Sequence, residues 1–197
     1  AKFGGEYVWN KAQFDAINPA STTKLLGLFE PSHMQYDVDR PADTAGEPTL
    51  AEMTDKAIDV LKKNPKGYFL MVEGGRIDHG SHAGNAYRTL SDTVAFSDAV
   101  KKALEKVDLK DTLVIVTADH SHTLTIAGYP KRGNPILGKV VSPGKTTPDL
   151  AADGKPYTTV GFANGIGYYQ SQPGDAVYAQ TARAGRIEDM TAVDTED

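Results

Sequence analysis

Two short segments of the chain hold four of its five histidines together with three carboxylates. The first segment, VEGGRIDHGSHAG, covers residues 72–84, and the second, TADHSH, covers residues 117–122. Their acidic and imidazole side chains are Glu73, Asp78, His79, His82, Asp119, His120 and His122. Carboxylates that lie side by side repel one another unless cations lie between them. Imidazole with carboxylate suits Zn²⁺ and oxygen ligands alone suit Mg²⁺, so the two segments predict a centre for divalent metal ions.

The spacing within each segment indicates how these side chains can share an ion. Asp78 and His82 are four residues apart where the chain enters a predicted helix, so both can face one ion. Asp119 and His120 follow a predicted strand and can converge on a second ion. A lone histidine near a strand end is more often structural, and the neighbouring carboxylates are what favour ligand roles here.

Other polar residues near these segments have simpler explanations. Ser81 and Ser121 are predicted to be spacers that turn the backbone rather than nucleophiles. Arg76 is predicted to form a structural ion pair, and His33 is predicted to lie on the surface. Three helical aspartates are expected to face solvent, namely Asp55, Asp92 and Asp98.

The elements around the two segments predict an α/β fold. Residues 68–73 form an apolar run typical of a strand buried on both faces, and residues 112–118 form a second one. Between them, apolar residues recur at helical spacing from 82 to 107. A strand, a helix and a strand of these lengths predict a βαβ unit with parallel strands. Ligands collect beyond the carboxyl ends of such strands, so both metal-binding segments are expected at one edge of the sheet.

The residues before this unit predict a further strand and helix. Residues 25–29 are apolar and end at Pro31, as a strand followed by a loop does. Thr49 and Glu52 have the spacing of a capping box, in which each side chain accepts from the other's backbone N–H. A helix is therefore expected from residue 50 to about residue 64, before Pro65.

The character of the chain changes near Gly128. Residues 128–174 are rich in Gly, Pro, Lys and Thr, with one strand-like segment at YTTVGFANG, and a polar tail follows. We therefore divide the chain into residues 1–127, part of the α/β metal-binding core, and residues 128–197, an insertion with a tail.

Composition excludes several classes of function. The net charge of −5 does not provide the clustered cations that nucleic-acid binding requires. No apolar run approaches the ~20 residues of a membrane-spanning helix, and the first residues do not have the pattern of a signal peptide. The chain has no cysteine, which excludes thiol catalysis and disulfides.

The metal-binding segments resemble those of the alkaline phosphatase family. The similar stretches are YFLMVEGGRIDHGSHAGNAYRTLSDTV and LVIVTADHSH, and the likeness extends to EYVWN, LLGLFEP and YTTVGFANGIGY. It covers nearly the whole chain and is nearest to the vertebrate-like bacterial members. The resemblance implies a three-layer sandwich with a mainly parallel sheet, present here as a partial domain.

By position, the resemblance assigns metal ligands to five residues. It implies a Mg²⁺ ligand at Glu73, two ligands of a first Zn²⁺ at Asp78 and His82, and two ligands of a second Zn²⁺ at Asp119 and His120. Two further histidines are implied as supporting residues: His79 within reach of the phosphate through water, and His122 orienting the first-zinc ligands. Either of these two histidines can instead simply bond a neighbouring carboxylate.

The resemblance also implies a reaction whose nucleophile is not in this chain. Family members hydrolyse phosphate monoesters through a phosphoserine, and that serine lies in an Asp-Ser-Ala motif that this sequence does not contain. An early metal-bridging Asp and a phosphate-clamping Arg are expected upstream, and a third first-zinc ligand, a His, after Asp197. We therefore expect a fragment from the C-terminal half of the enzyme, inactive by itself.

Further expectations rest on the family alone. Residues from about 128 onward resemble the crown insertion that joins two subunits, which implies a homodimer, and the location is expected to be periplasmic or extracellular. The expected ligands are phosphate monoesters and inorganic phosphate. Glu30 and Glu47 lie where vertebrate-like members bind an additional calcium ion.

Two other functions remain open on the sequence alone. TADH also occurs in cofactor-independent phosphoglycerate mutases, which belong to the same superfamily, although the longer VEGGRIDHGSHAG favours a phosphatase. Alternatively, the chain is a binding or assembly module that its metal ions merely stabilise. Binding of two equivalents of zinc, with phosphate competing at the bound metal ions, favours the enzyme. Tight binding of one ion whose affinity phosphate does not change favours the module.

Overall fold

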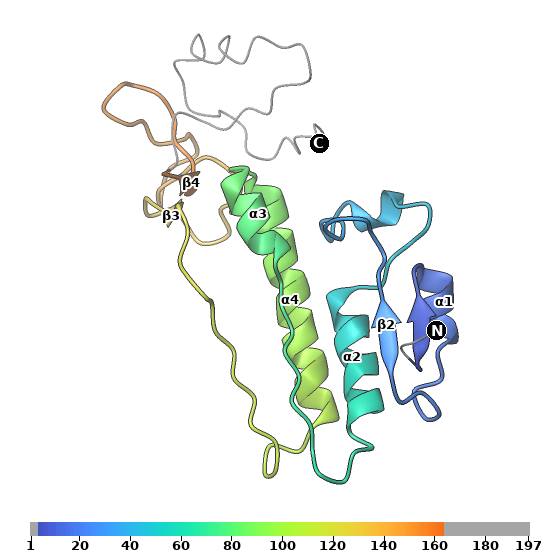
Figure 1. The fold of residues 1–197 in the computed structure, drawn as a ribbon. Coiled ribbons are helices and arrows are strands. Elements are labelled where there is room, and N and C mark those ends of the chain that lie inside the picture. Colours follow the sequence, from blue (N-terminus) through green and yellow to red (C-terminus); the bar gives the residue numbers. More distant parts are fainter. Residues whose placement is uncertain (1–3, 164–197) are drawn as a thin grey trace. The chain divides into compact units, whose positions relative to one another are not determined.

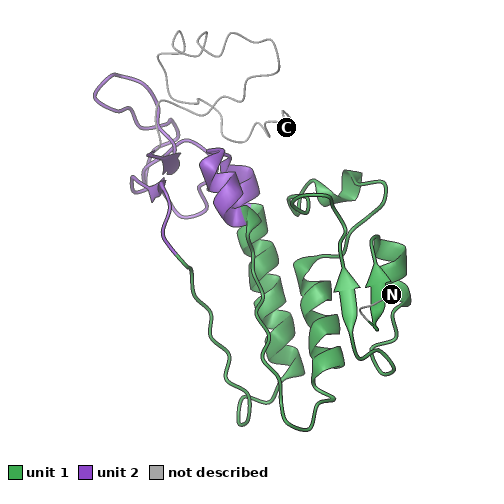
Figure 2. Ribbon diagram, in the orientation of Figure 1, with its two compact units in different colours: residues 1–76, 91–119 green, residues 77–90, 120–197 purple. Residues whose placement is uncertain are grey.

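A computed structural model describes residues 4–163, which form two compact units. Unit 1 comprises residues 1–76 and 91–119, and unit 2 comprises residues 77–90 and 120–197, in each case within the described range (Figure 2). Each unit is described by itself below. Figure 1 gives the order of helices and strands along the chain.

Unit 1 begins with two parallel strands joined by a short helix. β1 (Glu6–Val8) pairs with β2 (Leu25–Gly27), and α1 (Lys11–Ala16) lies between them in sequence. Asn10 caps α1, its side chain accepting from the backbone N–H of Gln13 at 2.9 Å. The strand predicted at residues 25–29 is therefore confirmed for its first three residues.

The hydrophobic core of this part of unit 1 is small. Its buried residues are Val8, Phe14 and Ile17, and the apolar residues packed against them are Leu25, Phe29 and Met53. Phe14 and Phe29 meet edge to face with ring centroids 5.9 Å apart. Met53 belongs to the next helix, so this cluster joins the strand pair to that helix.

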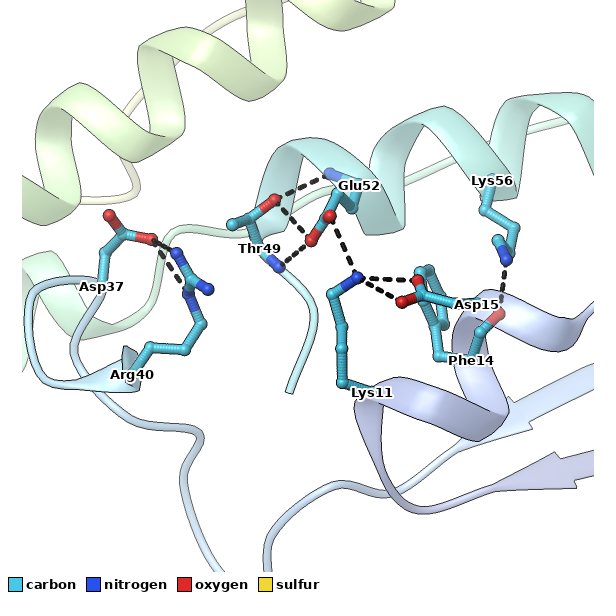
Figure 3. A network of polar contacts seen from close by, with 8 residues as sticks. All are labelled: Lys11, Phe14, Asp15, Asp37, Arg40, Thr49, Glu52 and Lys56. Atoms are coloured by element: carbon cyan, nitrogen blue, oxygen red, sulfur yellow. Dashed lines mark hydrogen bonds and ion pairs between the residues drawn. The ribbon is translucent and has the colours of Figure 1, made fainter. Parts of the chain in front are cut away.

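A capping box begins α2 (Leu50–Leu61), as the sequence predicts. The Thr49 hydroxyl accepts from the Glu52 N–H at 3.1 Å, and the Glu52 carboxylate accepts from the Thr49 N–H at 2.8 Å (Figure 3). Lys11 of α1 donates to Asp15 at 2.7 Å and lies 3.1 Å from Glu52. The ion pairs of Lys11 thus connect the starts of two helices.

The region before α2 is a loop with one 3-10 turn, η1 (Arg40–Ala42). Further along, Lys106 near the end of α4 (Ala86–Lys106) contacts Asp55 at 2.9 Å and Asp59 at 2.6 Å, both on α2. Asp55 is thus in an ion pair rather than simply solvated, contrary to the prediction. Lys106 holds the part of α4 in unit 1 against α2.

The two apolar runs of unit 1 are extended but are not strands among the described residues. Along 68–73, Phe69 and Met71 are 88% and 73% exposed, whereas Tyr68, Leu70 and Val72 are partly buried. Along 112–118, Leu113 and Ile115 are 84% and 75% exposed. The prediction of burial on both faces is wrong for the described residues, because they supply neither pairing strands nor a second covering layer.

The helix predicted from 82 to 107 is confirmed over α4, and only its first residue belongs instead to a separate helix. α3 (Arg76–His82) ends before residues 83–85, and α4 begins at Ala86. Gly84 has φ of 64°, a left-handed conformation that ends α3 and that side chains with a Cβ rarely adopt. The single helical period hid this corner, because apolar residues keep the same spacing across it.

In unit 2, β3 (Leu124–Ile126) and β4 (Val160–Phe162) form an antiparallel pair. Val160 of β4 and Val140 are buried apolar residues of this unit, 1% and 0% exposed. The strand predicted in YTTVGFANG is confirmed over β4, and the polar tail lies outside the described residues.

The described residues contain helices and two separate pairs of strands. The β1–β2 pair is parallel and the β3–β4 pair is antiparallel. A mainly parallel sheet in a three-layer sandwich is not formed by these residues. No helix in the described range has the length and apolar character needed to cross a bilayer.

Candidate metal centre

Helix α3 brings Asp78 and His82 onto the same face, one turn apart. His82 Nε2 lies 3.4 Å from Asp78 Oδ2. The His82 side chain is 70% exposed and that of Asp78 is 35% exposed. This is the juxtaposition that the four-residue spacing predicts.

Two histidines of the second segment face Asp78 within unit 2. His122 Nε2 lies 3.3 Å from Asp78 Oδ1, and His120 Nε2 lies 3.7 Å from the same oxygen. The rings of His82 and His122 meet edge to face, with centroids 4.6 Å apart. The structure thus groups one carboxylate with three imidazoles, of which His122 is the most buried, with a side chain 16% exposed.

Backbone contacts give these histidines different tautomers. His120 Nδ1 lies 2.8 Å from the Ser121 carbonyl oxygen, which can only accept, so Nδ1 carries a proton. His122 Nδ1 accepts from the Thr123 N–H at 2.8 Å, so its proton is on Nε2, the atom that faces Asp78. His120 is thus anchored on the backbone through Nδ1, whereas His122 turns its Nε2 towards the Asp78 carboxylate.

The group fits a cation on the chemistry of its donors. Asp78 Oδ1 is buried and makes no hydrogen bond within the described residues. His120 Nε2 lies 3.7 Å from this oxygen. Ligand atoms about 2.0–2.2 Å from a tetrahedral zinc ion lie roughly 3.4 Å from each other. The separation of 3.4 Å between Asp78 Oδ2 and His82 Nε2 is near that value.

Two of the remaining predicted site residues belong to unit 1 and one belongs to unit 2. Glu73 and Asp119 are exposed residues of unit 1, and Glu73 lies beside the backbone of Gly75. His79 is a partly buried residue of α3 in unit 2.

A second group of carboxylates lies in unit 1. Glu30, Asp43 and Glu47 bring one oxygen each within 4.8 Å of one another. Glu47 is 2% exposed; its Oε1 accepts from the Gln35 N–H at 2.9 Å, while its Oε2 and the Oδ2 of Asp43 are buried without a hydrogen bond within the described residues. Burial raises the pKa of Glu47 to about 7. Buried oxygens without donors fit a hard cation such as Ca²⁺.

Comparison with known proteins decides the family. The alkaline phosphatase family model matches residues 1–195. The chain belongs to the alkaline phosphatase family. The tissue-nonspecific alkaline phosphatase of Rattus norvegicus is 46% identical over 162 residues, and that of Homo sapiens is 44% identical over 163 residues. Each alignment covers 82% of this chain and 29% of the relative, so the chain spans less than a third of the length of these proteins.

A solved structure is also similar. The cold-active alkaline phosphatase from the psychrophile Shewanella sp. is 31% identical, with a TM-score of 0.44, over 52% of this chain and 24% of that one. The family model and the curated relatives, rather than this structure, confirm the resemblance found in the motifs at the level of the family.

Sequence reasoning missed the surroundings of two acidic residues of this chain. Asp43 stands four residues before Glu47, and Gly46 between them has φ of 74°. That Asp-x-x-Gly-Glu spacing was a usable signal for convergence. Asp92, predicted to be solvated, instead accepts from the Asp37 N–H at 3.2 Å, and burial raises its pKa to about 6.

Arg76 also has surroundings that the sequence did not indicate. Its guanidinium stacks on the Tyr36 ring, 3.7 Å from the centroid. The same positive charge lowers the pKa of Asp92 against the larger effect of burial. Both contacts lie within unit 1, so Arg76 ties the start of α3 to the loop that carries Tyr36.

Proposed function

We propose that this chain forms part of the metal-binding region of a phosphomonoester hydrolase, with phosphate monoesters as substrates and inorganic phosphate as product. Family membership supports the reaction class, since curated relatives are alkaline phosphatases. The observation that carries the proposal is the meeting of His82 and His120 at the Asp78 carboxylate, whose buried Oδ1 makes no hydrogen bond within the described residues.

Each metal-binding residue has a proposed ion. Asp78 and His82 hold a first Zn²⁺, Asp119 and His120 hold a second Zn²⁺, and Glu73 belongs to a Mg²⁺ site. Bound zinc acts as a Lewis acid that stabilises charge on phosphoryl oxygens.

The chain's own residues orient and tune this site. His122 Nε2 lies 3.3 Å from Asp78 Oδ1, and His120 Nδ1 donates to the Ser121 carbonyl so that its other nitrogen faces the carboxylate. His79 is proposed to reach phosphate through water. The exposure of His82 and His120, with side chains 70% and 56% exposed, leaves room for a substrate.

The nucleophile of the proposed reaction, a serine that becomes phosphorylated, lies outside this chain, because the sequence contains no Asp-Ser-Ala. We therefore expect negligible hydrolysis of p-nitrophenyl phosphate by residues 1–197 with Zn²⁺ and Mg²⁺ added. Turnover near that of an intact enzyme would contradict this part of the proposal. Binding of two equivalents of zinc, with phosphate competing for coordination positions on the bound ions, would support it.

The family also supports proposals on architecture and location. A three-layer sandwich would cover the exposed side chains of residues 68–73 and 112–118, with residues 1–127 in its core. Residues 128–197 would form a crown-like insertion at the interface of a homodimer, in a periplasmic or extracellular enzyme.

A further cation, besides the two zinc ions and the magnesium ion, is proposed at Glu30, Asp43 and Glu47. The buried oxygens without hydrogen bonds within the described residues favour it, and their chemistry suits Ca²⁺. The alternative to a phosphatase is a binding or assembly module that its metal ions merely stabilise. Tight binding of a single ion, with an affinity that phosphate does not change, would support that alternative.

A further inference from the structure

We infer that the contact between Gly80 of α3 and Thr89 of α4 positions the metal ligands Asp78 and His82. Gly80 lies midway between the two ligands in sequence, and all four residues belong to unit 2. The inference rests on the proposed zinc role of Asp78 and His82. It adds Gly80, Ser81 and Thr89 as positioning residues for that site.

First, helix α3 depends on tertiary contacts for its conformation. It has seven residues, and helices this short are unstable alone in water. A pair of ligands one turn apart converges on an ion only if that turn is fixed. The contacts of α3 with the beginning of α4 therefore decide where the two ligands point.

The second step is the close approach at Gly80. A Cβ placed on Gly80 would lie 2.9 Å from both the backbone nitrogen and the Oγ1 of Thr89, and 3.2 Å from its Cα. Two of these atoms are backbone, so no rotation of the Thr89 side chain would make room. Only a residue without a Cβ allows α3 and α4 to come this close.

The third step is a buried hydroxyl pair next to that contact. Ser81 and Thr89 are 2% and 4% exposed, and their hydroxyl oxygens are 3.3 Å apart. The Ser81 hydroxyl donates to the Ile77 carbonyl at 3.0 Å, so Thr89 is the donor between the two hydroxyls. Ser81 thus bonds one turn back along α3 and to α4 at once.

The fourth step is the closure of the corner between the helices. The Asn85 N–H donates to the Gly80 carbonyl at 2.9 Å, and the Thr89 N–H donates to the Asn85 carbonyl at 3.0 Å. Asn85 is therefore bonded to both residues of the contact. Every link from Gly80 to Thr89 is short and buried, so a shift at this contact must move Asp78 and His82.

The first experiment compares Gly80→Ala with Gly138→Ala as a matched control. Gly138 is in the same unit, and an added Cβ there meets Pro135 at 3.2 Å, a milder contact outside the metal group. Zinc affinity of residues 1–197 is measured by competition with a chromogenic chelator. We expect Gly80→Ala to weaken zinc binding by about tenfold or more, as loss of a supporting residue does, and Gly138→Ala to leave it near that of the unmodified chain.

A second readout separates positioning from general stability. Co²⁺ is bound at saturating concentration, and its visible absorption reports coordination geometry. We expect the spectrum of Gly80→Ala to differ from that of the unmodified chain, while the far-UV circular dichroism of the metal-free proteins coincides. Equal zinc affinity and identical Co²⁺ spectra would overturn the inference.

If Gly80→Ala does not fold, two milder substitutions of Thr89 test the inference instead. Thr89→Val keeps the shape of the side chain and removes the hydroxyl, whereas Thr89→Ser keeps the hydroxyl. We expect a several-fold loss of zinc affinity in Thr89→Val and near-complete retention in Thr89→Ser. Equal affinities in the two would overturn the inference. If the unmodified chain binds no zinc, the proposed function fails first and the inference with it.

Discussion

The two groups of metal-binding side chains differ in donor type and in burial. Glu30, Asp43 and Glu47 offer oxygen only, and Glu47 is 2% exposed. Asp78 is joined by imidazoles, and His82 has a side chain 70% exposed. In the first group, two buried oxygens without a hydrogen bond among the described residues, Glu47 Oε2 and Asp43 Oδ2, favour a hard ion that stabilises the fold. The second, mixed group is open to water and favours an ion that also meets a substrate.

The comparison shows that charge is balanced in different ways at the two places. In the acidic group, burial raises the pKa of Glu47 to about 7, so protons compensate part of the charge. In the imidazole group, the ring protons of His120 and His122 are directed by the backbone. A cation would displace protons at the first and complete a preformed arrangement at the second.

The largest effect is expected from His82→Ala on zinc. Removal of a ligand should weaken zinc binding at least about 100-fold, since loss of a supporting residue alone costs about 10–100-fold. His33→Ala is the matched control, because it removes an imidazole outside both groups. Isothermal titration of each variant with Zn²⁺ checks this, and unchanged affinity in His82→Ala would remove the zinc assignment. Calcium binding should be the same in both variants.

The next effect is expected from Glu47→Gln on calcium. An ion at 100 times its dissociation constant stabilises a protein by about 2.7 kcal/mol. We expect Ca²⁺ to raise the melting temperature of the unmodified chain and not that of Glu47→Gln. The metal-free variant should be no less stable, because the substitution removes a buried charge. A full calcium response in Glu47→Gln would exclude this carboxylate as a ligand.

A smaller effect is expected from Asp92, which lies outside both groups. Its pKa in the folded chain is about 6, above the ordinary value, so the folded state binds more protons than the unfolded state. Stability should therefore fall as pH rises from about 4 to about 6, by no more than about 2 kcal/mol. Urea unfolding across this range should show a flatter profile for Asp92→Asn. An identical slope in the variant would assign the pH dependence to Glu47 instead.

The smallest effect is expected from Thr49→Ala. Loss of an N-cap costs about 1 kcal/mol of stability, and Thr49 begins α2 two residues after Glu47. We expect urea unfolding to show this loss, a slight weakening of calcium binding, and no change in zinc binding. Thr49→Ser should restore stability. A zinc affinity that falls together with calcium affinity would contradict the independence of the two groups.

Local patterns were predictable from the sequence, because they depend on neighbouring residues. The capping box at Thr49 and the facing of Asp78 and His82 follow from spacing alone. The corner at Gly84 was not predictable, since helical spacing continues across it and the left-handed φ leaves no periodic signal. The convergence of Asp43 on Glu47 depends on a loop path that periodicity does not describe.

Contacts between distant residues were the least predictable. The reversed tautomers of His120 and His122 come from single backbone contacts, to Ser121 and from Thr123, that identical residue types do not distinguish. The predicted burial of residues 68–73 is greater than the observed burial. An apolar run indicates that a strand needs covering on both faces, but it does not show whether the described residues supply that cover.

The bare side chains of Phe69, Met71, Leu113 and Ile115 have a practical consequence. Extended apolar backbone without partners is the form from which chains aggregate edge to edge. Residues 1–197 produced without a complementary polypeptide should therefore have poor colloidal stability and recruit chaperones during synthesis.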